Sequence, residues 1–287
     1  MSRDVELQNL LKVQVFTVDG KGIHVTVPIV GENELSVTDI HTKVCHSLGL
    51  QKTSSIWFSL FCGKDIILKR LKPETFTPNT TKEITLRKWC HSKEIEAQLI
   101  KDDPVACHLV YLEAKAAISS GLLNVRHGQQ EKLEEYDDPA FKLEEKYVQL
   151  AQTFENYFSI AIKDCRITCN EFSGITPQIF HKGIVRVSYD GIQLHEGEKL
   201  VILEWKRLKM WLIHNDLSRI TLLYINPSGA EDTIVIETCQ FEYLLSAINL
   251  MVKELQVSSP SDSFFYSSMI STNDDGSRSY ENALFKA

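Results

Sequence analysis

Hydrophobic and polar positions change period once between residues 201 and 255. Four β-rich runs, at 201–205, 210–213, 220–225 and 234–236, are separated by short polar turns. Three further runs, at 160–168, 184–189 and 192–194, precede them. From residue 239 to residue 255 the apolar positions follow a helical period instead, on a face made of Phe241, Leu244, Leu245, Ile248, Met251, Val252 and Leu255. The pattern predicts seven short strands followed by one long amphipathic helix.

This order of elements is typical of a PH/PTB-like (pleckstrin-homology or phosphotyrosine-binding) sandwich. In such a lobe the helix plugs one end of the sandwich and leaves a groove beside the neighbouring edge strand, which receives peptides by strand addition. Residues 157–257 are therefore predicted to bind a ligand rather than to carry out chemistry.

The first 89 residues show a different order. Residues 11–29 read as a β-hairpin whose turn contains Gly20 and Gly22. A helix follows, capped by Ser36 or Thr38 and ended by Gly49. Strands are expected at 56–61, 66–68 and 83–87. The order is that of a ubiquitin-like β-grasp lobe, and a generic α+β domain is the alternative.

Residues 90–156 show no strand pattern. Asp103 and Pro104 form an N-cap followed by proline at the first helical position, and Gly121 stops that helix. Residues 124–138 are polar, as in a loop or a short solvated helix, and a second long helix is expected to begin near Pro139. The segment is predicted to be a small helical bundle.

The predicted fold class is thus α+β with three lobes and a tail. The lobes span residues 1–89, 90–156 and 157–257. Residues 258–287 are rich in Ser, Asp and Asn and carry no sustained period, which predicts a disordered tail. Its aromatic clumps, at 264–266 and 280–285, are candidate recognition motifs, and an inert tail is the alternative.

Composition narrows the class of function. The 287 residues carry a formal net charge of −7, which argues against nucleic acid as a partner. No run approaches the ~18 apolar residues of a membrane span, and the amino terminus does not resemble a secretory signal. Seven scattered cysteines read as buried thiols of a cytoplasmic protein.

No motif predicts catalysis, a metal or a cofactor. Cys and His are neighbours three times, at 45–46, 90–91 and 107–108, but adjacent side chains diverge on a helix or strand and cannot readily share a metal. There is no CxxC, Walker A, GxGxxG or GxSxG motif. We expect a non-enzyme without cofactors.

Several segments resemble the FERM modules of the PX-FERM sorting nexins. They are FSLF (58–61), LRKW (86–89), DPVACHLVYLEA (103–114), LAQT (150–153) and LEWKRLKMW (203–211). The resemblance covers residues 12–257, without a PX lobe ahead of them. It implies a three-lobed FERM module acting as a cytoplasmic adaptor, peripheral on endosomal membranes, that binds NPxY-like or NxxY-like sorting motifs in receptor tails. A Ras-like GTPase site on the first lobe is an analogy of fold alone.

Two other functions stay open. One is a membrane–cytoskeleton linker that binds phosphoinositide between the first and third lobes. Its candidate ligands are Lys69, Arg70, Lys72, Lys206, Arg207 and Lys209. The other is a scaffold that recruits a partner through its tail.

The peptide site is predicted between the edge strand 210–214 and the helix 239–255. Leu245, Ile248, Val252 and Leu255 are expected to point to the core. The candidate peptide-binding residues are Met210, Trp211, Leu212, Ile213, His214, Tyr243, Leu244, Ala247, Leu250 and Met251. Trp211 is expected to be the anchor, with capping of the sandwich as the alternative, and its replacement by alanine is expected to leave the fold intact. Trp89 and Trp205 are expected to be structural.

Overall fold

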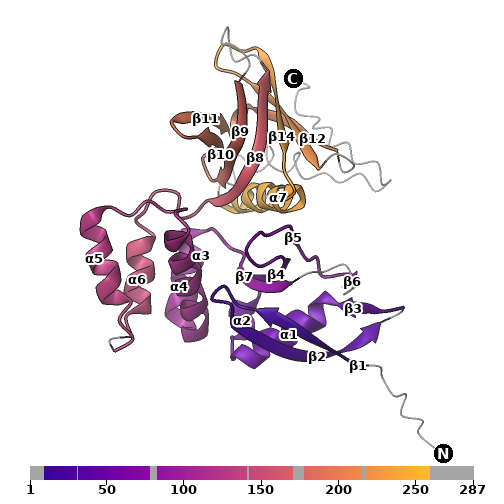
Figure 1. The fold of residues 1–287 in the computed structure, drawn as a ribbon, viewed down its shortest axis with the longest axis vertical. Helices are drawn as coiled ribbons and strands as arrows, with labels where there is room; N and C mark the ends of the chain where they lie inside the picture. The colour runs from indigo at the N-terminus through magenta and orange to yellow at the C-terminus, as the bar shows by residue number, and fades with distance from the viewer. Residues whose placement is uncertain are drawn as a thin grey trace, which may run out of the picture. The chain divides into compact units, whose positions relative to one another are not determined.

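The computed structural model describes residues 10–30, 32–77, 83–140, 142–170, 178–214 and 218–258. The chain divides into two compact units, residues 1–157 and 158–287 (Figure 1). The predicted tail lies outside the described residues, apart from Ser258, which ends the last helix.

The first unit contains a seven-stranded sheet with the order β5-β4-β7-β1-β2-β3-β6. Its strands are β1 (Leu10–Phe16), β2 (Gly22–Val30), β3 (Glu34–Ser36), β4 (Phe58–Cys62), β5 (Lys69–Arg70), β6 (Thr75–Phe76) and β7 (Ile84–Lys88). The predicted hairpin is the antiparallel pair β1–β2, and β1 also pairs in parallel with β7. The sheet and its crossing helix confirm the β-grasp lobe.

Helix α1 (Val37–Leu48) begins and ends where the sequence indicates. The Ser36 hydroxyl accepts a hydrogen bond from the Asp39 N–H at 3.2 Å. Gly49 follows the helix in the left-handed conformation, with φ of 78°. Glycine is the usual residue in this conformation at a helix C-terminus. A short helix, α2 (Lys52–Ser55), leads into β4.

The strand predicted at 66–68 is wrong, because the paired residues are Lys69 and Arg70. Gly63 accounts for the shift. Its φ is 107°, and a Cβ there would stand 1.9 Å from the Ile66 carbonyl oxygen. The chain therefore folds tightly back on itself after β4, and residues 66–68 form that turn rather than a strand.

Four helices complete the first unit: α3 (Lys93–Asp102), α4 (Pro104–Ser119), α5 (His127–Tyr136) and α6 (Glu144–Ala151). The Asp103 carboxylate accepts from the N–H groups of Val105 and Ala106 at 2.9 and 3.2 Å, which confirms the predicted cap. The second long helix was expected near Pro139 but begins at Glu144 and is short. The polar stretch before it is helical.

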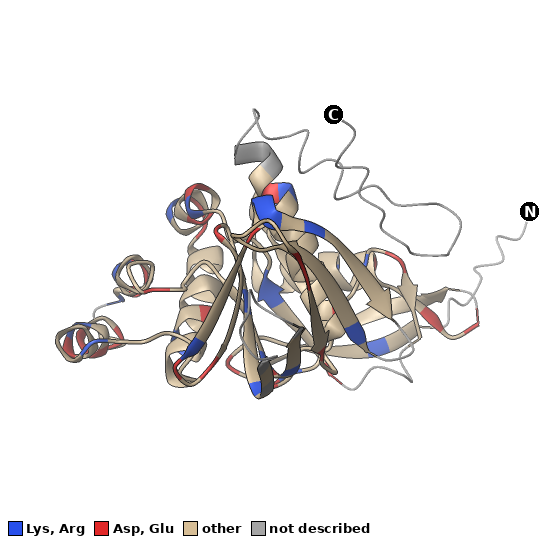
Figure 2. Cartoon of the chain, turned by 90° about the horizontal axis from the view of Figure 1, so that it is seen from above, with Lys and Arg blue, Asp and Glu red and all other residues tan. Residues whose placement is uncertain are grey.

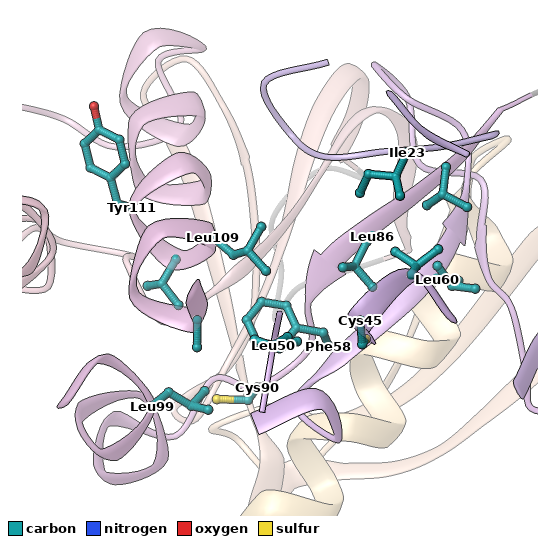
Figure 3. Packing of buried hydrophobic residues seen from close by; sticks show 14 of the residues in the cluster. Ile23, Cys45, Leu50, Phe58, Leu60, Leu86, Cys90, Leu99, Leu109 and Tyr111 are labelled. Atoms are coloured by element: carbon teal, nitrogen blue, oxygen red, sulfur yellow. The ribbon is translucent and has the colours of Figure 1, made fainter. Parts of the chain in front are cut away.

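One continuous hydrophobic core joins the sheet to these helices. Leu50, Phe58 and Leu86 from the β-grasp side lie near Leu109, while Cys90 faces Leu99 (Figure 3). Trp89, expected to be structural, is buried where the sheet passes into the helices and makes an edge contact with Phe61, ring centroids 5.2 Å apart.

The second unit is a seven-stranded sandwich closed by a helix. Its sheet order is β11-β10-β9-β8-β14-β13-β12. The elements are β8 (Ile160–Asn170), β9 (Gln178–Ser188), β10 (Gly191–Glu196), β11 (Lys199–Glu204), a 3₁₀ turn (Trp205–Arg207), β12 (Leu208–His214), β13 (Arg219–Ile225), β14 (Glu231–Glu237) and α7 (Phe241–Ser258). Seven strands and a terminal helix confirm the PH/PTB-like prediction.

Helix α7 lies across one end of the sandwich in this unit (Figure 1). Trp205, also expected to be structural, is buried, and its indole N–H donates to the Ser188 carbonyl at 2.8 Å.

Candidate functional site

Strand β12 is an edge strand, as the predicted peptide site requires. In the part of the chain that the structure describes, its only partner is β13, with which it pairs antiparallel from Leu208 to His214. A register shift between Leu208 and Met210 marks a bulge. The far side of the strand therefore has backbone N–H and C=O groups to which another strand can bond.

The two faces of β12 differ in what they contact. Trp211 lies in register with buried Leu222, and Ile213 lies in register with buried Ile220, so both belong to the core face. Met210, Leu212 and His214 alternate with them and lie on the opposite face. Of the five strand residues predicted for the groove, only Trp211 and Ile213 share the face that the core occupies.

Trp211 is not a surface anchor. Only 1% of its surface is exposed, and it is among the largest fully buried side chains of the described residues. It stands at the end of a buried row formed with Leu222, Ile234 and Cys169 on neighbouring strands. The alternative, in which this indole fills the sandwich, is correct. Ile213 is half-buried, so of the two candidates on the core face of β12 it is the one that a ligand can contact.

The predicted orientation of helix α7 is only partly correct: Ile248 and Val252 are buried in the core, as expected. Leu244, Ala247 and Met251, expected to line the groove, are completely buried. Leu245 and Leu255, expected in the core, are half-buried. Apolar residues cover well over half of the helix circumference, so periodicity alone did not fix which stripe faces inward.

The remaining helix candidates, Tyr243 and Leu250, are half-buried on one flank of α7. Further along the same flank, the Tyr189 hydroxyl, between β9 and β10, donates to the Glu254 carboxylate at 2.5 Å. The carboxyl-terminal end of this flank is therefore occupied by the β9–β10 hairpin. That contact weakens the assignment of Tyr243 and Leu250 to a site beside β12.

The candidate phosphoinositide ligands of the first unit divide into two kinds. Lys69 and Lys72 are exposed. Arg70 is partly buried: its Nε donates to the Ser59 hydroxyl at 3.0 Å, and its guanidinium lies 5.5 Å from the centre of the Trp89 ring. Burial lowers the pKa of Arg70. This arginine is held by its own lobe.

The candidates of the second unit divide in the same way. Lys206 is exposed, whereas Arg207 donates to Glu204 at 3.2 Å and Lys209 pairs with Glu231. Figure 2 shows basic and acidic positions interspersed along helices and strands. Arg70, Arg207 and Lys209 thus each have an acidic or polar partner within their own unit.

Six of the seven cysteines are buried, as predicted, whereas the prediction is wrong for Cys239, which is exposed. Burial raises the pKa of four thiols to about 11, which keeps them protonated and unreactive at neutral pH. These are Cys45, Cys107, Cys165 and Cys169. Within the described ranges, no group of three or more His, Cys, Asp or Glu residues is placed to hold a metal ion. None of the described helices is long and apolar enough to cross a membrane.

Comparison with known proteins identifies the architecture. No family model and no curated protein matches the sequence. Among solved structures, the complex of the FERM and C-terminal domains of Drosophila Merlin matches with a TM-score of 0.59 at 14% identity, covering 88% of this chain and 98% of that one. The fold is that of a FERM module.

Two myosin structures agree. The MyTH4-FERM MF2 domain (mutant 1) of Dictyostelium discoideum myosin VII matches with a TM-score of 0.57 at 9% identity, and the MF1 domain with 0.54 at 10%. The matches cover 86% and 85% of this chain but 61% and 60% of the myosin chains, so this chain spans about three-fifths of them. At these identities the likeness shows the FERM fold alone.

Sequence reasoning missed one feature of the FERM module's third lobe. Strand β11 forms the other edge of the sheet, and its Leu200 and Ile202 are exposed. The uninterrupted apolar run LVIL at 200–203 was the available signal, since a strand with one solvated face normally alternates apolar with polar residues.

Proposed function

We propose that this chain is a non-catalytic adaptor whose third FERM lobe binds extended NPxY-like or NxxY-like segments of receptor tails. The bound segment adds to β12 as an eighth strand. The observation that carries the proposal is the edge position of β12 beside a helix-capped sandwich.

Main-chain hydrogen bonds to β12 supply affinity in this proposal, and they place few demands on the ligand's side chains. Selectivity then comes from the side chains that flank the strand. Ile213 is the partly exposed apolar contact on the core face, while Met210 and Leu212 offer contacts on the other face. A ligand strand alternates in the same way, so it presents apolar residues to both sides of the sheet.

A peptide ligand is favoured over a phosphoinositide headgroup. A headgroup needs several cations converging on one phosphate cluster. Arg70, Arg207 and Lys209 already have partners in their own units. We therefore favour binding of receptor tails over binding of lipid. Endosomal sorting is the process that we propose such an adaptor serves.

The test is a titration of the full chain with a fluorescent NPxY peptide and with the same peptide carrying alanine at Asn, Pro and Tyr. Wild type should bind the first and not the second. Ile213→Lys should weaken binding about 30-fold or more, because a cation replaces the apolar contact at the strand edge.

Ile179→Lys is the matched control, because Ile179 is an exposed apolar strand residue of the same unit on β9. It should bind like wild type. Equal affinity of the Ile213→Lys variant, with an unchanged melting temperature, would place the site elsewhere. Equal binding of both peptides would remove the NPxY assignment.

A further inference from the structure

The second edge of the third-lobe sheet is unusually regular. Strand β11 pairs with β10 without a register shift from Lys199 to Glu204, and in the described part of the chain it has no partner on its other side. Natural edge strands are normally protected by a bulge, a proline or an inward-pointing charge. Strand β12 has a bulge, whereas β11 has neither a bulge nor a proline, and its charged residues, Lys199 and Glu204, lie only at its two ends.

The outward face of β11 is apolar and exposed. Leu200 and Ile202 are 56% and 47% exposed, and they lie two residues apart on one face. Leu203, on the other face, is 1% exposed and belongs to the core. A straight open edge with two large apolar side chains on its free face is suited to pairing with another strand.

We propose that β11 is a self-association edge, and that its occupant is β11 of a second copy of this chain. The two strands run antiparallel about a two-fold axis that passes through Val201, perpendicular to the sheet. In that register Leu200 of each copy stands opposite Ile202 of the other, so the contact forms twice. The four exposed side chains then make one apolar cluster on a continuous sheet.

Charge at the ends of β11 favours the antiparallel arrangement. The residues up to the start of β11 carry two acids and one base: Glu196 at the end of β10, Glu198 in the turn, and Lys199. The residues at its other end carry Glu204 followed by Lys206 and Arg207, so the first end is net acidic and the second net basic. Antiparallel pairing brings the acidic end of each copy to the basic end of the other, whereas parallel pairing would bring like charges together. Glu204, at the end of the ladder, accepts from Arg207 at 3.2 Å, which limits its repulsion of a facing acidic residue.

The size of the contact sets its strength. Pairing of two six-residue strands buries well below the roughly 1,200 Å² of a stable interface. We therefore expect a reversible dimer whose population rises with protein concentration. If β12 binds receptor tails, as the proposed function holds, one dimer carries two such edges and binds clustered tails with added avidity.

The test is sedimentation of the full chain over about a hundredfold range of concentration. Wild type should shift from monomer toward dimer. Leu200→Glu and Ile202→Lys should each weaken dimerisation at least tenfold by placing a charge against an apolar side chain. The double variant Leu200→Glu/Ile202→Lys should recover it, because each Glu then faces a Lys.

The double variant is specific to the register about Val201. If the strands slide by one residue in each copy, identical residues face each other, and two Glu or two Lys side chains would repel. Ile179→Lys is the control for added charge on an exposed strand residue and should dimerise like wild type. Sedimentation does not depend on peptide binding, so the dimer proposal is tested independently of the proposed function.

A wild type that stays monomeric throughout the range would overturn the proposal. So would single variants that associate as wild type does, since β11 would then not be the contact. Failure of the double variant to recover would overturn the register about Val201, and with it the paired Leu200–Ile202 contact.

Discussion

At the scale of the residue, Trp211 shows how a strand divides its side chains between core and surface. An indole at an edge strand suits both a peptide anchor and a core residue, and the local sequence is the same in the two cases. The register decides, because Trp211 stands opposite Leu222 in a row of buried side chains. Its ring fills the sandwich.

Trp211→Ala should therefore destabilise the second unit by roughly 3–5 kcal/mol, the range for removal of a buried aromatic side chain. Urea unfolding followed by circular dichroism measures the loss. Trp57→Ala is the comparison, because Trp57 is only half-buried, and it should cost clearly less. If the Trp211→Ala protein were as stable as wild type, the ring could not be a buried part of the core.

At the scale of the element, a buried ion pair joins the last β-grasp strand to the helices. Lys88 of β7 pairs with Glu96 of α3, and their side chains are 8% and 0% exposed. Gln152 donates to the same carboxylate at 2.8 Å, and the Lys88 ammonium lies 5.1 Å from the Tyr157 ring centre. Burial by itself would lower the pKa of Lys88. The negative charge of Glu96 outweighs that effect, so the pKa of Lys88 is raised.

Glu96→Gln should destabilise the first unit by about 3–5 kcal/mol, because it removes the carboxylate that pairs with the buried Lys88 ammonium. Glu131→Gln, at an exposed position on α5, should change stability little. Thermal unfolding of both variants provides the comparison. A second substitution, Lys88→Met in the Glu96→Gln background, should restore part of the loss, and no restoration would show that the charge is not the cause.

Elements with local signals could be predicted, and those set by packing could not. Ser36, Gly49 and the Asp103–Pro104 pair mark helix ends through their own hydrogen bonds and dihedral angles, so the sequence is sufficient there. The phase of α7 depends on which of several apolar stripes the sandwich accepts. The Lys88–Glu96 pair depends on a sheet and a helix meeting, and neither residue carries a local signal for that.

At the scale of the whole molecule, the chain consists of two compact units, and the β-grasp and helical lobes share the first of them. The second unit carries both proposed strand edges, at β11 and β12. The order of the lobes was predictable, because each lobe has its own pattern of strands and helices. The edge position of β12 was predicted from the PTB-like order of elements, whereas the exposed edge at β11 was missed.

The second unit, prepared as residues 158–258, should fold without the first. Its core consists of residues from its own strands and α7, so we expect one cooperative unfolding transition and retention of NPxY-peptide affinity within about threefold of the full chain. Calorimetry and the peptide titration check both points. An aggregated or non-cooperative fragment would show that the first unit is needed for its stability.

The parallel pairing of β1 with β7 has a consequence for synthesis of the chain. Residues 10–16 and 84–88 are neighbours in the sheet although most of the β-grasp lobe separates them in sequence. The hairpin of β1 and β2 can form early on the ribosome, but β7, which pairs with β1, is the last strand of this lobe to be made. The core that the lobe shares with the helices continues to Phe154. Such high contact order slows folding. The nascent hairpin must therefore keep its apolar face from other chains until the residues up to Phe154 have been translated.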